Sequence, residues 1–170
     1  MTIVGCREPI SHTVAERMKT LAREQCRAEI LYRLRTVRPE STRRWGRMSA
    51  HQMICHLSDS CRMATGQKPV SDATGRLPRT VVKWIALYLP LQWPTGNLAT
   101  RPEIDQEVAG TCPGDFAADV AELEALLEII TTRQKGFNWP VHPVFGRMSH
   151  RAWLRWAYLH TDHHLRQFGA

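Results

Sequence analysis

Residues 115–132 read DFAADVAELEALLEIITT, and this stretch decides the fold class. Its early acidic residues suit the positive end of a helix dipole, and its Leu, Ile, Val and Ala residues form an apolar stripe at helical spacing. The pattern predicts an amphipathic helix over the whole stretch. Because no part of the chain shows a convincing alternation of polar and apolar residues, we expect an all-α protein.

Three further main helices are predicted around this one. Apolar residues recur at helical spacing from about 14 to 34, which indicates a first amphipathic helix. Two more are expected after copies of one tetrapeptide, Gly-Arg-Met-Ser, at 46–49 and 146–149, each preceded by an aromatic residue. Each Ser is a candidate N-cap, and Gln52 completes a capping-box pattern with Ser49. Common capping chemistry explains the match, so no internal duplication is inferred.

Residues 65–113 form an irregular segment with many Pro and Gly residues and one short apolar helix expected near 81–89. The predicted fold is therefore a four-helix bundle with an irregular insertion between the second and third main helices. The length of 170 residues fits a single domain, 1–170, in which residues 1–17 are a candidate N-terminal extension.

Composition narrows the classes of function. The first residues lack the apolar core of a secretory signal, and the longest apolar stretch, 81–93, is shorter than the ~20 residues that a membrane-spanning helix needs. The five cysteines form no C-x-x-C pair, so we expect a cytoplasmic protein with reduced thiols and no membrane partner. The net charge of +7 raises nucleic-acid binding as one hypothesis. However, the basic residues are dispersed along the chain and no nucleic-acid-binding motif is present. We therefore expect no nucleic-acid partner.

The segment 158–164, YLHTDHH, places three histidines in five positions of a predicted helix. At ~100° per residue, His160 and His164 lie about 40° apart, inside an apolar arc that includes Trp153 and Trp156. His163 lies on the flank of this arc, where we expect it to be partly exposed or to support a neighbouring residue. Aromatic residues at helical spacing are more often core than pocket, and we expect the two tryptophans to be core.

A third histidine is available from the second predicted helix. His56 borders the core face of that helix, whereas His51 is expected to face water. Two imidazoles at i, i+4 can reach one ion, and a third from another helix would complete a set of three ligands with an open position. The histidines could instead be structural, with carbonyl or carboxylate partners. Asp59, one turn after His56, is expected either to orient that ring or to be solvated.

The site is not that of a zincin, because Thr161 and not Glu follows His160. No residue is therefore assigned as the general base.

Two segments resemble a known group of proteins. They are WGRMSAHQMICHLSD, residues 45–59, and HPVFGRMSHRAWLRWAYLHTDHHLRQFG, residues 142–169. Both look like the DinB/YfiT-like superfamily of four-helix-bundle proteins that are proposed to be metalloenzymes. Within it, the chain is most similar to a bacterial branch of unknown function with a WPxGxxTxPExDQ-like segment, here at 93–106.

The resemblance implies a divalent metal ion, with zinc or nickel expected, on His56, His160 and His164. Relatives in the superfamily include thiol-dependent transferases and isomerases and some hydrolase-like members.

Two hypotheses about function follow. The first is a metal-dependent enzyme that activates water or a thiol, as a hydrolase or a transferase of a low-molecular-weight thiol. The second is a non-catalytic bundle that binds a metal or a small ligand. A small-molecule substrate is the expected partner, and a bundle face could also form a homodimer. Arg62 and Arg166 point away from the core on their helices, so neither is assigned to the substrate.

Overall fold

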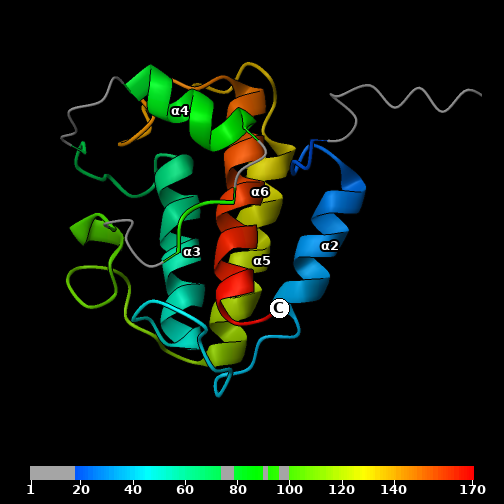
Figure 1. Ribbon diagram of the computed structural model, residues 1–170, viewed down its shortest axis with the longest axis vertical. Helices are drawn as coiled ribbons and strands as arrows, with labels where there is room; N and C mark the ends of the chain where they lie inside the picture. The colour runs from blue at the N-terminus through cyan, green and yellow to red at the C-terminus, as the bar shows by residue number, and fades with distance from the viewer. Residues whose placement is uncertain (1–17, 74–78, 90–91, 96–99) are drawn as a thin grey trace, which may run out of the picture.

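The structure, a computed structural model, describes residues 18–73, 79–89, 92–95 and 100–170 (Figure 1). Within these ranges the chain forms five α-helices, one short 3₁₀ helix and no β-strand, which confirms the all-α prediction. The elements are α2 (Glu24–Leu34), α3 (Ala50–Ala64), α4 (Arg79–Tyr88), η1 (Pro102–Ile104), α5 (Phe116–Thr132) and α6 (His150–Gln167).

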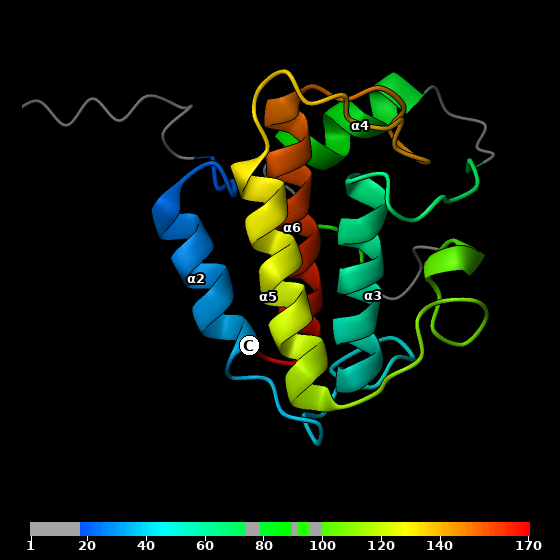
Figure 2. The same cartoon turned by 180° about the vertical axis from the view of Figure 1, so that it is seen from behind.

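The four longer helices, α2, α3, α5 and α6, run side by side (Figures 1 and 2). Helix α3 packs against both α5 and α6, and α2 packs against α6. Helix α4 lies across one end of this group and contacts α6, while η1 contacts α3. The contact between α3 and α6 brings together the two helices on which the histidine ligands are predicted.

One apolar core joins these helices. Ile30 of α2, Ile54 of α3, Leu123 of α5 and Trp153 of α6 are all at most 1% exposed. Burying a side chain of this size stabilises a protein by roughly 1.5–3 kcal/mol. The core therefore fixes the relative positions of α3 and α6 from several sides.

The two Gly-Arg-Met-Ser segments begin α3 and α6 in the same way. Gly46 and Gly146 have φ values of 76° and 68°, in the left-handed region that glycine adopts without strain. Ser49 Oγ accepts a hydrogen bond from Gln52 N at 3.1 Å, and Gln52 Oε1 accepts one from Ser49 N at 2.8 Å. Ser149 caps α6 through Ala152 N. Both N-caps and the capping box are thus confirmed.

The first predicted helix begins later than its apolar spacing suggests. Residues 14–17, like the rest of the candidate extension 1–17, lie outside the described residues, and α2 starts only at Glu24. Leu21 N instead donates a hydrogen bond to Leu154 O at 3.2 Å. Leu21 therefore lies in a turn that packs on α6, and its apolar side chain is buried there. It does not belong to the helix that its spacing predicted.

The insertion, 65–113, contains the predicted short helix as α4, together with η1. Each helix in the described part of the chain falls short of the length or apolar character needed to cross a membrane.

Candidate metal centre

Three histidines from two helices converge on one point. His56 lies on α3, and His160 and His164 lie one turn apart on α6. One ring nitrogen from each lies within 4.8 Å of the others, and His56 Nε2 is 3.3 Å from His160 Nε2. In the described part of the chain, this group contains no other His, Cys, Asp or Glu.

Hydrogen bonds fix the tautomer of two of the rings. His56 Nδ1 is 2.8 Å from Ile104 O, and a carbonyl can only accept, so Nδ1 carries the proton and Nε2 keeps its lone pair. Gln167 Nε2 donates to Trp45 O at 2.7 Å, which turns Gln167 Oε1 toward His164 Nδ1 at 3.0 Å. His164 Nδ1 therefore also carries its proton. Both rings offer Nε2 as a metal-binding atom, and such partners typically orient metal-binding histidines.

The geometry fits a tetrahedral metal ion. Two nitrogens bound to zinc at ~2.0–2.1 Å lie about 3.3–3.4 Å apart. The 3.3 Å between the Nε2 atoms of His56 and His160 matches this separation. Three imidazoles form a donor set that accepts zinc, nickel, copper or iron.

Burial keeps these imidazoles neutral. Burial lowers the pKa of His56 below its usual value. For His160 and His164, burial and then the neighbouring imidazoles hold the pKa well below the usual range. All three rings therefore have a free lone pair at neutral pH, which is the form that binds metals. His160 alone among them is partly exposed.

Aromatic rings surround the cluster. Trp156 stacks on His160 with centroids 5.0 Å apart and an interplanar angle of 21°. Trp153 and Trp156 are both buried, as predicted for core residues. Trp93, from the insertion, lies 6.0 Å from His160 and 6.1 Å from His163 between ring centroids, and it is only half-buried. Trp93 therefore forms one wall on the more accessible side of the cluster.

One of the two predictions for His163, partial exposure, is wrong. Its side chain is buried, at 7% exposure, because Trp45 and Trp93 from other parts of the chain cover the flank of α6. Burial first, and then Arg166, lower the pKa of His163 to about 4. His163 Nδ1 is buried without a hydrogen-bond partner among the described residues.

Neither prediction for Asp59 is correct. The carboxylate is fully buried and accepts bonds from Thr111 N and Thr111 Oγ1, both at 2.7 Å, and from Gln106 Nε2 at 3.1 Å. It also pairs with Lys68 and Arg62. Burial alone would raise the pKa of Asp59, but the bonds from Lys68 and Thr111 outweigh burial and lower it.

The role that Asp59 plays is to hold the insertion against α3. It binds Gln106 and Thr111, just after η1, and the carbonyl of Ile104 in η1 orients His56. The ring of His56 thus depends on the insertion and not on a carboxylate of its own helix.

His51 does not simply face water as predicted. Its Nε2 lies 2.6 Å from Asp119 Oδ2, because α5 packs against that side of α3. Arg62 and Arg166 pair with acidic residues, Arg62 with Asp59 and Glu122 and Arg166 with Asp162, and neither contacts the histidine cluster in the interactions described.

Sequence reasoning missed the groups that orient the ligands. Gln167 lies three residues after His164, and this spacing on a helix was a usable signal. The carbonyl groups of Ile104 and Trp45 gave no signal, because every residue carries a carbonyl and only the fold brings these two to the site.

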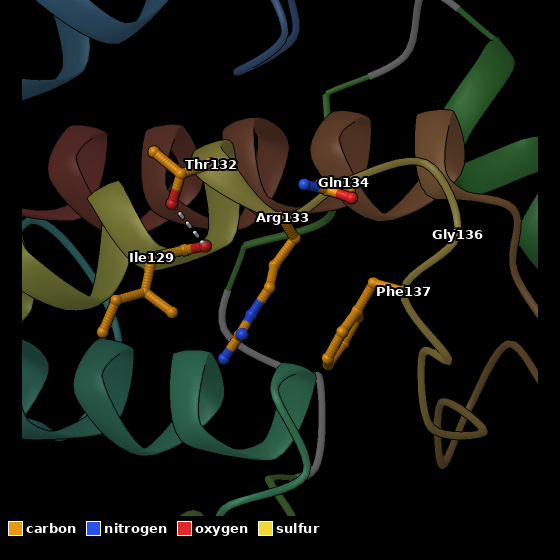
Figure 3. Close-up of a pocket in the computed structure, with 6 residues that line it drawn as sticks. All are labelled: Ile129, Thr132, Arg133, Gln134, Gly136 and Phe137. Atoms are coloured by element: carbon orange, nitrogen blue, oxygen red, sulfur yellow. Dashed lines mark hydrogen bonds between the residues drawn. The ribbon is translucent and has the colours of Figure 1, made fainter.

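A pocket of about 620 Å³ lies elsewhere, at the end of α5 (Figure 3). It is lined by Ile129, Thr132, Arg133, Gln134, Gly136 and Phe137. The Arg133 guanidinium lies 4.6 Å from the centroid of the Phe137 ring. None of the lining residues belongs to the histidine cluster. We place the candidate site at the histidines because their nitrogens converge on one point.

Comparison with known proteins gives a family. Residues 16–170 match the family described as "Protein of unknown function (DUF1569)", and the chain belongs to this family. No curated protein and no solved structure matches the chain significantly.

Proposed function

We propose that this member of the DUF1569 family is a metal-dependent enzyme with a DinB/YfiT-like four-helix bundle, in which His56, His160 and His164 bind a divalent ion. The observation that carries the proposal is the convergence of three neutral imidazoles, two of them buried and the third partly buried, with Nε2 unprotonated on His56 and His164. Zinc or nickel is the expected ion, because imidazole nitrogen suits both.

The donor set favours catalysis over a purely structural role. Three neutral ligands leave the full charge on a divalent ion, which can lower the pKa of water to ~7 or deprotonate a thiol. The protein contributes ligand orientation through Ile104 O and Gln167, and it excludes water from most of the cluster. Hydrolysis and transfer of a low-molecular-weight thiol are the two reactions that fit this chemistry.

A substrate would approach on the side of His160. His160 is partly exposed, whereas His56 and His164 are buried. Trp93 lies beside His160 on this side and offers an apolar ring face. A small molecule with an apolar portion is therefore the substrate class that this surface favours.

One observation favours a non-catalytic bundle instead. The 3.3 Å between the Nε2 atoms of His56 and His160 also suits a hydrogen bond, in which His160 Nε2 donates its proton to His56 Nε2. That arrangement would satisfy both buried nitrogens without a metal ion.

Metal-dependent activity distinguishes the two functions. Protein treated with a chelator would be assayed for ester hydrolysis and for thiol transfer, before and after zinc or nickel is added. We expect activity to return with the metal in the parent and not in the His160→Ala/His164→Ala variant. Metal that binds without supporting either reaction would favour the non-catalytic bundle.

A further inference from the structure

A second group of metal-binding side chains lies on the other side of α3. His51 and Cys55 are one turn apart on α3, and Asp119 reaches them from α5. One ligand atom from each lies within 4.8 Å of the others. Asp119 Oδ2 is 2.6 Å from His51 Nε2 and 3.6 Å from Cys55 Sγ.

These distances are near those of a zinc site. Sulfur and oxygen bound to one tetrahedral zinc lie about 3.5 Å apart, and nitrogen and oxygen about 3.3 Å apart. The sulfur–oxygen separation of 3.6 Å already fits. The nitrogen–oxygen separation of 2.6 Å is that of a hydrogen bond and would have to lengthen by about 0.7 Å. Asp119 Oδ2 also accepts a hydrogen bond from Gly114 N at 2.9 Å, which would adjust with this change.

Burial and access also suit an ion. Cys55 is only 2% exposed, whereas the side chains of His51 and Asp119 are 19% and 20% exposed. The thiol would form the inner side of the site, and the other two ligands would face solvent, from which an ion can enter.

The charge of this group differs from that of the three histidines. A neutral imidazole, a thiolate and a carboxylate together carry two negative charges, which cancel those of a divalent ion. The Cys55 thiol has to lose its proton to bind an ion, so metal binding releases a proton. A neutralised ion is less suited to activating water than to linking two helices.

We propose that His51, Cys55 and Asp119 form a second divalent-metal site, best suited to zinc, that links α3 to α5. Cys55 precedes His56 on α3. A metal ion bound to Cys55 would therefore stabilise the position of His56, a proposed ligand of the first centre. This proposal does not depend on the function of the three-histidine cluster.

Cobalt(II) absorption tests the second site separately from the first. A thiolate bound to cobalt gives an intense near-ultraviolet charge-transfer band, which three imidazoles cannot give. Titration of the parent protein with cobalt should produce this band with an intensity that corresponds to one thiolate–cobalt bond per chain. We expect Cys55→Ser to abolish the band, and Asp119→Asn and His51→Gln to weaken the binding at least tenfold.

The control variant lacks Cys112, the exposed thiol of the described residues, and Cys6, which lies outside them. This Cys6→Ser/Cys112→Ser variant should keep the full band. Circular dichroism would show that each variant is folded. The proposal is overturned if folded parent protein gives no thiolate band, if the band survives in Cys55→Ser, or if the control variant loses it.

Discussion

The orientation of the proposed metal-binding histidines depends on single hydrogen bonds. Gln167 joins two parts of the chain, since its amide nitrogen donates to Trp45 O and its amide oxygen faces His164 Nδ1. Without this acceptor, His164 could turn or change tautomer, and its Nε2 would no longer be held toward the other rings.

Gln167→Ala should therefore weaken zinc binding by about 10–100-fold, the range typical of residues that orient metal ligands. Gln167→Glu keeps an acceptor for His164 but loses the donor to Trp45 O, so its zinc affinity should lie between those of Gln167→Ala and the parent. A competition titration against a chromophoric chelator would measure both affinities. The exposed Gln67 is a matched control, and Gln67→Ala should bind like the parent. Equal affinities for Gln167→Ala and the parent would contradict the role of Gln167.

His142 should make stability depend on pH. Its Nδ1 accepts hydrogen bonds from Val144 N and Phe145 N, so Nε2 carries the proton, buried without a partner in the described part of the chain. Burial lowers its pKa to about 3. In the unfolded chain the pKa is ~6.5. Below about pH 6.5, His142 is protonated in the unfolded state, whereas in the folded state it stays neutral down to about pH 3. The unfolded state therefore gains stability relative to the folded state as pH falls.

This single proton should cost about 1.4 kcal/mol of unfolding free energy per pH unit between about pH 6 and pH 3. His142→Asn keeps an acceptor near the position of Nδ1 and removes the titration. Urea unfolding of chelator-treated protein at a series of pH values would give the unfolding free energy as a function of pH. Between about pH 6 and pH 3, this free energy should fall less steeply in the variant than in the parent, by about 1.4 kcal/mol per pH unit. An unchanged slope would mean that His142 is protonated in the folded protein.

Among individual residues, the sequence predicted which histidines meet but not what surrounds them. The i, i+4 spacing of His160 and His164 and the helical angle of His56 are local properties, and the structure brings these three residues together. Their binding of a metal stays a prediction. The buried states of His163 and Asp59 could not be predicted from their own helices, because segments distant in the sequence cover them.

At the level of elements, the turn before α3 also supports the candidate metal centre. Gly46 has a φ of 76°, and a Cβ atom added there would lie only 2.6 Å from Gln167 Nε2. The turn thus needs glycine both for its backbone angle and for the approach of Gln167. Gly66, just after α3, has nearly the same φ, 78°, but nothing within 4 Å of the corresponding position.

A comparison of the two glycines separates the effect of backbone strain from the effect of the clash with Gln167. Gly46→Ala and Gly66→Ala should each lose about 1–2 kcal/mol of stability to the left-handed backbone. Only Gly46→Ala should also displace Gln167 and so weaken zinc binding, by about tenfold or more. Chemical unfolding and zinc titration of both variants would test this. Loss of zinc affinity in Gly66→Ala to the same extent would show that strain alone is responsible.

The elements themselves were largely predictable where the signals are local. Ser49, Gln52 and Asp115 mark the starts of α3 and α5, and the apolar stripes give their type. The start of α2 was placed too early, because Leu21 keeps the apolar spacing of a helix while its backbone bonds to Leu154 instead. Helical spacing of apolar residues indicates that their side chains are buried, but it does not show that the backbone is helical. A turn that packs on α6 buries Leu21 equally well.

For the whole molecule, the sequence predicted the all-α class but not the role of the insertion. Composition marked residues 65–113 only as irregular. In the structure this segment supplies Ile104, which orients His56, and Trp93, which lies over His160. The candidate metal centre is thus a property of the assembled molecule, since α3, α6, the insertion and the turn at Trp45 all contribute to it.

The metal content of protein purified without an affinity tag or chelator, measured by mass spectrometry, tests the central claim most directly. The account predicts that His160→Ala/His164→Ala contains one metal equivalent per chain less than the parent. His150→Ala, which changes a histidine of α6 outside the cluster, should keep the parent's content. Equal metal content in the parent and the double variant, or a parent that cannot be loaded with zinc or nickel, would contradict it.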